Sequence, residues 1–505
     1  MIRETWFVAR PKRTLTHIVE ELFIFSEMVD GKVWSSDKEL QLNFENELGR
    51  RGIKNSGSFR ARTTGAGGGG VRTYIAQLKQ LGFVFTEEDT DKLRLTLAGE
   101  AMISGKQSFT EVIRHQIVRF QYPSNSFLSG RNPISPRFKV HPFWLMLKIL
   151  ADHRVSYLTY DEIAAVLMKE GDSDAKAELL ISTIVRNREM NYSYDVSKED
   201  ADIANTFANY LRATQFVCAS RGTSNKEGTV FINEEFRNEI ESLVEIPLPL
   251  IKDWDNQETF QRRYGCDKNH KKDTRKFALQ DFTPAQIMER RISHEFASLA
   301  MATPIKEINM DVVNKIASIT GFTPSQCEIV LKRIYPEGGL EGFFFKYREM
   351  AFASRDEATD FEIATANLFK EVFGFHTKHI GPIGNTPDVY VESPNKDFCG
   401  IIDNKAYKNG YSISGDHYRV MVDVYIPKYG TDTCPLSFFT YISGGFKSTI
   451  DQQIQSIKDA TGVNGSAINV DDVISLARKF KQVGYDTYKV RDVLSVNRLV
   501  SISDY

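Results

Sequence analysis

Two aspartates and one lysine in the last quarter of the chain have the types and spacing of a hydrolytic site. Asp388 follows a proline and opens an apolar segment, and Asp403 and Lys405 end the next apolar segment. If both segments are strands, alternation places Asp403 and Lys405 on one face and turns Asn404 away. Asp388 on a neighbouring strand can then place its carboxylate beside that of Asp403.

This pattern predicts chemistry on a phosphate ester. Two carboxylates and a backbone carbonyl, that of Asn404, form a hard oxygen site suited to Mg²⁺. Such an ion stabilises negative charge on a phosphate and lowers the pKa of an attacking water. Lys405 is placed to orient that water or to help deprotonate it.

The same layout resembles that of the PD-(D/E)xK nucleases, and the likeness extends to their FokI-type cleavage domain. It runs in register from about residue 356 to residue 494. It is carried by the segments 379–381, 387–388, 402–407, 410–411, 441–447, 464–467 and 470–473. By this resemblance Asp388, Asp403 and Lys405 are catalytic, and Glu362 takes the place of a helical glutamate. The alternative for Glu362 is an exposed helix charge without a role.

The elements around these residues indicate the domain that positions them. An amphipathic helix is expected over 357–373, with Phe361, Ala364 and Leu368 on its apolar stripe. The resemblance implies an α/β/α nuclease domain with a mixed central sheet, which we assign to residues 351–505.

The first half of the chain repeats one short order of elements. A helix over 71–81, strands at 83–85 and 93–96 and a helix over 98–103 form the first copy, and 203–243 carries the second. Helix, strand, turn and strand is typical of a winged helix-turn-helix, which binds DNA or mediates protein contacts. We therefore expect winged-helix-like subdomains at 1–150 and 151–250.

Residues 251–350 are expected to hold a linker and a helical subdomain that resembles a helix-turn-helix. The charged stretch 256–276 is interpreted as a linker or exposed loop, with Cys266 and His270 as solvated residues rather than zinc ligands. Gly321 and the Thr-Pro pair that follows it are typical of a turn between two helices. Such helical corners also occur in proteins that do not bind DNA.

Five arginines are candidates for DNA contact. Arg60, Arg62 and Arg72 flank a glycine run just before the first recognition-like helix, and arginines match phosphate oxygens or guanine edges. Arg114 and Arg119 lie on a later helix, where an ordinary basic face is an equal alternative. The glycine run is not a Walker loop, because no Gly-Lys-Ser/Thr follows it.

The N-terminal half also resembles the recognition region of the AlwI group of type IIS restriction enzymes. The segments 81–85, 93–103, 121–124 and 206–217 carry this looser similarity. It implies binding to a short asymmetric site in double-stranded DNA and cleavage at a displaced position. It also implies a cognate methyltransferase on a separate chain.

Composition limits the remaining classes. The 505 residues are 41% hydrophobic and 26% charged with a net charge of −2, so any DNA-binding surface must be local. Neither a signal peptide nor a membrane span is expected, and five scattered cysteines argue against a disulfide framework. We expect a cytoplasmic protein without membrane contact.

The combined hypothesis is a multidomain type IIS-like restriction endonuclease. One such site cuts one strand, so a transient homodimer through the nuclease domain would complete a double-strand break. Residues 414–425, where the family's interface falls, depart from its pattern despite Asp416 and Arg419. A strand-specific nicking enzyme or the large subunit of a two-chain enzyme therefore remains an alternative. A second alternative is a DNA-binding regulator with an inactive nuclease domain.

Overall fold

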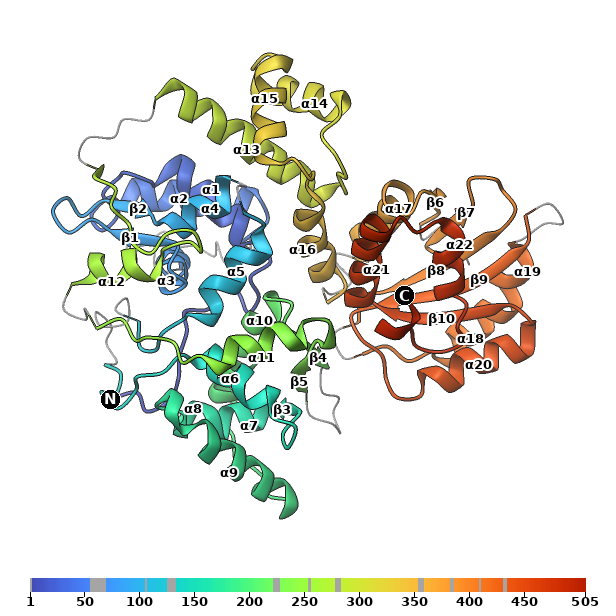
Figure 1. Cartoon of the computed structure of the whole chain (residues 1–505), viewed down its shortest axis with the longest axis horizontal. Coiled ribbons are helices and arrows are strands. Elements are labelled where there is room, and N and C mark those ends of the chain that lie inside the picture. The colour runs from blue at the N-terminus through green and yellow to red at the C-terminus, as the bar shows by residue number, and fades with distance from the viewer. Residues whose placement is uncertain are drawn as a thin grey trace. The chain divides into compact units, whose positions relative to one another are not determined.

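The computed structural model describes two compact units. One unit comprises Met1–Glu295 and Ile319–Val330, and the other comprises Phe296–Ser318 and Leu331–Tyr505 (Figure 1). The residues described are 2–54, 70–104, 107–124, 133–220, 228–252, 256–277, 283–352, 358–381, 386–407, 410–429 and 434–505.

The C-terminal unit is built on a five-stranded mixed sheet of order β10-β9-β8-β7-β6. Antiparallel pairs join β6, β7 and β8, and parallel pairs join β8, β9 and β10. The strands are β6 (His376–His379), β7 (Val389–Glu392), β8 (Cys399–Lys405), β9 (Leu436–Ser443) and β10 (Asn464–Asn469). The predicted mixed sheet is therefore present.

Composition explains the place of each strand in this sheet. The apolar run of β8 is buried on both faces, as expected of a central strand, whereas polar β6 lies at an edge and is half exposed. Gly400 in β8 is required by close packing, because a Cβ there would lie 2.2 Å from the Phe438 ring. The polar end of β8 is thus held by a rigid, fully covered strand.

Helices cover both faces of the sheet (Figure 1). The apolar cores on the two faces are separate, and each takes side chains from its own helices. One face carries α16 (Leu340–Met350), α17 (Ala358–Glu371), α21 (Val470–Val483) and α22 (Thr487–Val493). The other carries α18 (Gly415–Arg419), a π-helical segment (Val420–Tyr425), α19 (Ile426–Lys428) and α20 (Ile450–Thr461).

The C-terminal unit extends upstream of residue 351, where we expected it to begin. In α16, Phe343, Phe344 and Tyr347 join the same apolar core as α17 and β8. Arg348 of α16 is buried and forms an ion pair with Asp471 of α21. Because aromatic burial of this size stabilises a core by several kcal/mol, α16 is an integral part of the unit.

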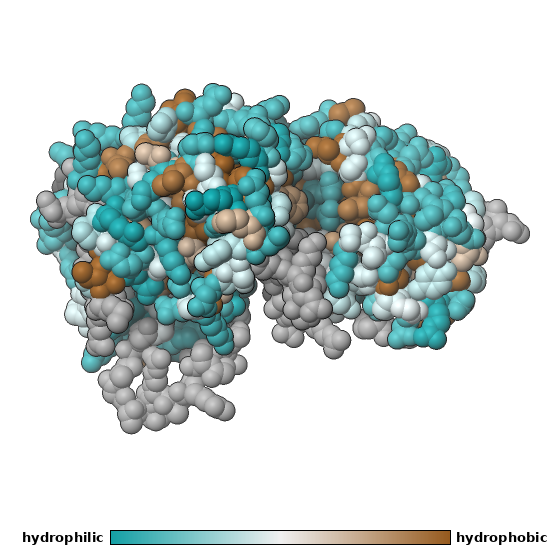
Figure 2. Space-filling view, turned by 90° about the horizontal axis from the view of Figure 1, so that it is seen from below, coloured by the Kyte–Doolittle hydropathy of each residue, from teal (hydrophilic) through white to brown (hydrophobic). Residues whose placement is uncertain are grey.

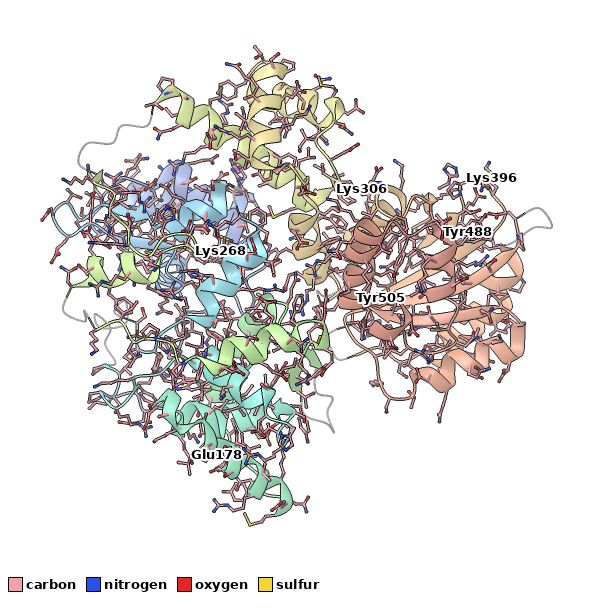
Figure 3. The ribbon with its side chains drawn as sticks, viewed as in Figure 1. Glu178, Lys268, Lys306, Lys396, Tyr488 and Tyr505 are labelled. Carbon is pink, nitrogen blue, oxygen red and sulfur yellow. The ribbon has the colours of Figure 1, made fainter. Side chains whose placement is uncertain are left out.

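The end of the chain packs against α21. The Tyr505 hydroxyl donates a hydrogen bond to Asp472 Oδ1 at 3.0 Å, and Lys479 Nζ donates to the Tyr505 carbonyl at 2.6 Å (Figure 3). At the far end of this unit, the Tyr488 hydroxyl donates to Asp397.

The N-terminal unit is mainly helical with two small sheets, β1-β2 and β3-β5-β4. Elements occur at the positions predicted for the first repeat copy, and Gly82 adopts a φ of 76° after the helix. That copy comprises α3 (Val71–Gln80), β1 (Val84–Thr86), β2 (Leu93–Leu95) and α4 (Leu97–Ser104). Helices α1 (Ile18–Met28) and α2 (Lys38–Arg50) precede this copy. The helices between it and the second copy are α5 (Phe109–Val118), α6 (Pro142–Ala151), α7 (Tyr160–Glu162), α8 (Met168–Glu170) and α9 (Ala177–Glu189).

The second repeat copy also has its predicted elements, with one addition. It comprises α10 (Lys198–Ala213), β4 (Val217–Ser220), β5 (Thr229–Ile232) and α11 (Arg237–Glu245). A short strand that the sequence analysis did not identify, β3 (Tyr157–Thr159), pairs with β5. Three residues directly before a helix carry too little periodicity to reveal a strand. Whether the two copies bind DNA as winged helices remains a prediction.

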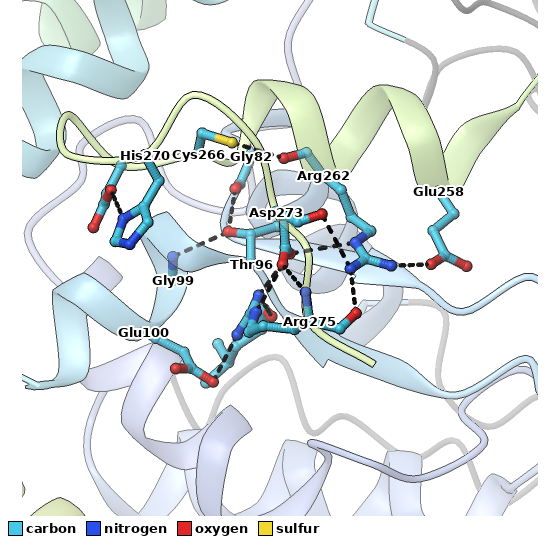
Figure 4. Close-up of polar contacts among 12 residues, drawn as sticks. Gly82, Thr96, Gly99, Glu100, Glu258, Arg262, Cys266, His270, Asp273 and Arg275 are labelled. Atoms are coloured by element: carbon cyan, nitrogen blue, oxygen red, sulfur yellow. Dashed lines mark hydrogen bonds and ion pairs between the residues drawn. The ribbon is translucent and has the colours of Figure 1, made fainter. Parts of the chain in front are cut away.

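The interpretation of 256–276 as a linker or exposed loop is wrong for residues 257–264, whereas residues 268–272 do form an exposed loop. Residues Gln257–Tyr264 form helix α12, with Phe260 and Tyr264 fully buried. Cys266 is also buried, and its thiol donates to the Arg262 carbonyl, while His270 pairs with Asp267 (Figure 4).

A buried ion cluster holds the following residues in place. The Asp273 side chain is enclosed, with Arg262 Nε at 3.3 Å and Arg275 Nη2 at 2.9 Å from its Oδ2 (Figure 4). Glu258 and Glu100 pair with the outer sides of the two guanidinium groups. The charged composition predicted exposure to solvent here, but Arg262, Asp273 and Arg275 are paired with opposite charges inside the fold.

Two further helices flank the predicted helical corner. They are α14 (Met310–Thr320) and α15 (Pro324–Ile334), and α13 (Pro284–Ala302) precedes them. Gly321 ends α14 with a φ of 76°, and the Thr323 hydroxyl accepts a hydrogen bond from the Gln326 amide at the start of α15.

Most of the face drawn in Figure 2 is hydrophilic, with hydrophobic residues in small groups between hydrophilic ones. Across the described residues, none of the helices has both the length and the apolar character needed to cross a lipid bilayer.

Candidate active site

The register of β7 and β8, continued by one residue, brings Asp388 opposite Asp403. Val389 of β7 pairs with Ile402 of β8 in the antiparallel ladder, so Asp388, just before β7, faces the residue that follows Ile402. Directly opposed side chains lie on one face of a sheet with Cβ atoms about 5 Å apart. The Asp388 carbonyl accepts a hydrogen bond from Ile380 at 3.0 Å, which ties this end of β7 to the segment after β6.

Lys405 joins the two carboxylates on the same face. Its Nζ lies 2.7 Å from Asp403 Oδ1, and the side chains of Lys405 and Asp403 are 14% and 7% exposed. Burial disfavours the charged amine, but Asp403 and Asp388 outweigh this effect and raise the pKa of Lys405. The lysine is therefore charged at neutral pH.

Asp388 is the group whose protonation is most strongly disturbed. The Asn404 backbone amide donates to Asp388 Oδ2 at 2.6 Å. Burial, and then the neighbouring Asp403, raise the pKa of Asp388 to about 9, with Glu362 adding a smaller effect and Lys405 opposing it. Ionising both carboxylates beside a single lysine is unfavourable in free energy, because their mutual repulsion is poorly screened away from water.

The side chain of Asn404 turns to the opposite face, as alternation predicts. Its Nδ2 donates to Thr365 Oγ1 at 2.6 Å, and the Tyr347 hydroxyl donates to the same oxygen at 2.9 Å. Thr365 in turn donates to the Phe361 carbonyl of α17. This network connects α16 and α17 to the polar end of β8 and fixes the strand that carries Asp403 and Lys405.

Glu362 of α17 lies at the edge of the site and is paired with His379. Glu362 Oε2 and His379 Nε2 are 3.0 Å apart, and the two side chains are 14% and 26% exposed. Glu362 contributes to the raised pKa of Asp388, so it lies close enough to affect the carboxylate pair. The sequence analysis placed His379 in the resembling segment but gave it no role.

Tyrosines surround the carboxylate face, and two of them, Tyr411 and Tyr441, stand in segments that carry the family resemblance but were given no role from the sequence. Tyr411 and Tyr441 are buried in the core on this face. Burial raises the pKa of Tyr411, Tyr425 and Tyr441, and the Asp403 charge raises each further. Tyr425 belongs to the π-helical segment, a distortion that often marks functional sites. The Gly410-Tyr411 pair was the signal available in the sequence, and Gly410 adopts a φ of 75° in the structure.

The predicted DNA-binding arginines fall into three groups. Arg60 and Arg62 lie outside the described residues. Arg72 is exposed on the first turn of α3. Arg114 Nε donates to the Thr214 carbonyl at 2.7 Å, and Arg119 Nη1 lies 3.0 Å from His115 Nε2.

Arg114 and Arg119 are thus engaged inside the N-terminal unit. The Arg114 guanidinium also packs over the Phe216 and Phe236 rings at 4.5 and 4.2 Å. These contacts give Arg114 a packing role whether or not it reaches DNA. The five arginines are therefore not equivalent, and their contact with DNA remains a prediction.

A metal bound by side chains alone is not indicated. Within the part of the chain that the structure describes, no group of three or more His, Cys, Asp and Glu side chains is arranged to hold an ion. Asp388 and Asp403 supply two carboxylates, so a cation here would complete its shell with a backbone carbonyl and water.

Comparison with known proteins agrees with this geometry. Residues 321–501 match the family model of the FokI cleavage domain. The type II restriction enzyme StsI of Streptococcus sanguinis is 29% identical over 143 residues, which are 25% of this chain and 23% of StsI. The type II restriction enzyme FokI of Planomicrobium okeanokoites is 25% identical over 147 residues, 26% of this chain and 25% of FokI.

These matches cover only part of each relative. The aligned regions span about a quarter of the two curated proteins. A solved structure of restriction endonuclease FokI aligns over 99% of this chain and 100% of its own, with a TM-score of 0.30 and 14% identity. At that TM-score the structural alignment supports no argument about the fold.

Proposed function

Because its C-terminal region is similar to the FokI cleavage domain, we propose that this chain is a type IIS-like restriction endonuclease. It would bind a short asymmetric site in double-stranded DNA and hydrolyse phosphodiester bonds at a displaced position. The observation that carries the proposal is the placing of Asp388 opposite Asp403, with Lys405 at 2.7 Å from Asp403. Repulsion between two opposed carboxylates costs free energy, so a purely structural role does not explain the pair.

Mg²⁺ fits the residues present. Asp388, Asp403 and the Asn404 carbonyl would hold the ion, and a dication would relieve the repulsion that raises the pKa of Asp388. When bound, it would supply positive charge to the phosphate and lower the pKa of a bound water.

The protein's own residues would perform the remaining steps. Charged Lys405 would orient the attacking water and stabilise the negative charge that develops as the water oxygen bonds to phosphorus. The attacking water would release its proton to solvent, the bond from phosphorus to the leaving oxygen would break, and that oxygen would take a proton from solvent. Glu362, held by His379, would act at the edge of the site by positioning groups around Asp388.

Recognition would belong to the N-terminal unit. Its two repeat copies supply helices and short hairpins suited to groove binding, and Arg72 is exposed at the start of α3. We assign Arg60, Arg62, Arg72, Arg114 and Arg119 to DNA contact as candidates. The cognate methyltransferase would be a separate chain, and both would act in the cytoplasm, where the DNA is.

One such site cuts one strand, so double-strand cleavage would need a second nuclease domain from a transient homodimer. The segment proposed for this contact includes Asp416 and Arg419, which pair with each other and are 83% and 71% exposed. A strand-specific nicking enzyme or the large subunit of a two-chain enzyme is the outcome if no such dimer forms.

A plasmid assay tests the proposal. Purified full-length protein with Mg²⁺ should convert supercoiled plasmid to linear product with a defined set of ends. Open circles alone would indicate nicking. Specific binding without cleavage, in Mg²⁺ and in Mn²⁺, would favour a regulator and contradict the proposed function.

A further inference from the structure

Tyr411 holds a fixed position on the carboxylate face of the sheet. Its amide donates to the Gly445 carbonyl at 2.8 Å, and its own carbonyl accepts from Lys447 at 2.9 Å. The side chain is 1% exposed and packs against Tyr441, with ring centroids 5.5 Å apart. Backbone and ring are thus both constrained, so the hydroxyl has little freedom to move.

The Tyr411 hydroxyl is bonded to His417 of α18. The oxygen lies 2.8 Å from His417 Nδ1, which is its only hydrogen-bond partner among the described residues. Burial, and then the Asp403 charge, raise the pKa of Tyr411, so the phenol keeps its proton. A buried hydroxyl without an acceptor is costly, and therefore the phenol donates to Nδ1.

This bond decides which nitrogen of His417 carries hydrogen. Burial, and then the nearby Lys405, lower the pKa of His417, while Asp403 and Asp416 oppose them, so the ring is neutral at pH 7. With Nδ1 accepting from Tyr411, the hydrogen of the neutral ring resides on Nε2. None of the described groups accepts a hydrogen bond from Nε2, although the ring is only partly exposed.

His417 and Lys405 lie against the same tyrosine ring. The imidazole centroid is 5.8 Å from the Tyr411 centroid, and Lys405 Nζ is 5.9 Å from it. Lys405 also lowers the pKa of His417, so the imidazole lies within electrostatic range of the amine that we place at the reacting phosphate. An anionic oxygen of the nucleic acid backbone is the acceptor expected there, since half or more of protein–DNA hydrogen bonds go to phosphate and sugar.

We propose that His417 is a further DNA-contacting residue of the nuclease site, donating from Nε2 to a backbone phosphate oxygen beside the cut, and that Tyr411 is the residue that orients it. The proposal rests on the proposed function and deepens it. A hydrogen bond to a charged group contributes enough to change a rate by about 10- to 100-fold. His417→Phe should therefore slow single-turnover cleavage by that factor, and Tyr411→Phe by less.

The test uses full-length protein and a duplex carrying the site found by sequencing cleaved plasmid ends. Each phosphate near the cut is replaced in turn by a methylphosphonate, which removes the charge and one acceptor oxygen. In the wild type, one position besides the scissile phosphate should reduce the rate about as much as His417→Phe does. The His417→Phe variant should be insensitive at that same position, because the contact is already lost.

Two further variants separate this role from a structural one. His417→Gln places an amide donor near the former Nε2 and should recover part of the rate. Tyr418→Phe removes a hydroxyl on the same helix that, among the described residues, donates only to the Ser456 carbonyl, at 3.4 Å, and it should cut like the wild type. Thermal unfolding of each variant reports whether it is folded, and His417→Gln carries the test if His417→Phe does not fold.

The results distinguish the two proposals. Cleavage by His417→Phe at the wild-type rate overturns this inference and leaves the proposed function intact. A slower His417→Phe that keeps the wild-type methylphosphonate pattern also overturns it, since the residue would then act only through packing. If the wild type cuts no duplex, the proposed function fails and this inference fails with it.

Discussion

The chain contains two clusters of buried charge that differ in their balance. Around Asp273, two arginines face one enclosed carboxylate, and Glu258 and Glu100 complete the pairing. Burial opposes ionisation of Asp273, but the Arg275 and Arg262 contacts outweigh it and lower its pKa. This cluster is electrostatically satisfied and needs no ligand.

The cluster around Asp388 is not satisfied. Two opposed carboxylates share one lysine, and the pKa of Asp388 is raised to about 9. A fold that only needed stability would gain by replacing one carboxylate, because buried repulsion costs free energy. A buried cluster with an excess of one charge, which we call unbalanced, therefore indicates a candidate cation site, whereas a buried cluster with matched charges does not.

The largest expected effect is the loss of DNA cleavage when a residue of the cluster around Asp388 is replaced. Asp388→Ala, Asp403→Ala and Lys405→Ala should each lower the single-turnover cleavage rate by more than roughly 100-fold, because metal-supported charge stabilisation is lost. Gel-shift affinity for the specific site should remain close to that of the wild type. Near-normal cleavage by Lys405→Ala would show that the site is misassigned.

Removing the N-terminal unit, which contains the cluster around Asp273, should leave DNA cleavage but abolish recognition of a specific site. A fragment of residues 296–505 contains the whole C-terminal unit and should fold and cut DNA weakly without sequence preference. A fragment of residues 351–505 lacks α16, with its buried aromatics and Arg348, and should be unfolded or aggregated. Circular dichroism and nuclease assays on both fragments measure this. Site-specific cutting by either fragment would place recognition in the wrong unit.

Removing the carboxylate of Asp273, whose charge is matched by two arginines, should lower the stability of the protein rather than its cleavage rate. Asp273→Ala leaves Arg262 and Arg275 facing each other without their shared carboxylate, which should lower the free energy of unfolding by about 3 kcal/mol. Denaturant unfolding measures the loss, and Asp89→Ala, at an exposed position, is the matched control. Equal stability of the two variants would refute a structural role for the cluster.

The unbalanced cluster should make metal-free protein sensitive to alkaline pH. Because the pKa of Asp388 is raised from 3.8 to about 9 in the folded protein, its contribution to stability is complete below pH 3.8 and is lost progressively as pH rises towards 9. In EDTA, the wild type should therefore unfold more easily at pH 9.5 than at pH 6.

Asp388→Asn and added Mg²⁺ test the cause of that sensitivity. Asp388→Asn cannot ionise and should lose most of the difference between the two pH values. Mg²⁺ should raise the melting temperature of the wild type but not of Asp388→Asn, because binding to the folded state stabilises it. A pH difference that is unchanged in Asp388→Asn would assign it to another group.

The smallest expected effects concern the arginines. Arg72→Ala should weaken specific DNA binding by roughly 1 kcal/mol and relax specificity at one position, since Arg72 is exposed at a helix start. Arg114→Ala should instead lower the melting temperature, because its guanidinium is used inside the unit. Salt-titrated binding of both variants decides between these roles. A phosphate-contacting Arg60 or Arg62 would lower the salt slope by about one unit.

The sequence by itself determined the local arrangement of the site. Alternation along β8 places Asp403 and Lys405 on one face and Asn404 on the other, because side chains in a strand have a period of two. Apolar runs and glycine punctuation likewise predicted both repeat copies in the N-terminal unit, since each depends on residues close together in the chain. The mixed sheet followed from the resemblance.

Only the tertiary structure decided which distant residues meet. The pairing of His417 with Tyr411, of His379 with Glu362 and of Asp273 with its two arginines has no periodic signal, because each depends on how separate elements pack. The burial of α12 and the inclusion of α16 in the core of the C-terminal unit could not be predicted from the sequence for the same reason. Charged residues in a sequence usually predict a segment that is exposed to solvent. Only the fold shows where charged side chains are buried because they pair with opposite charges.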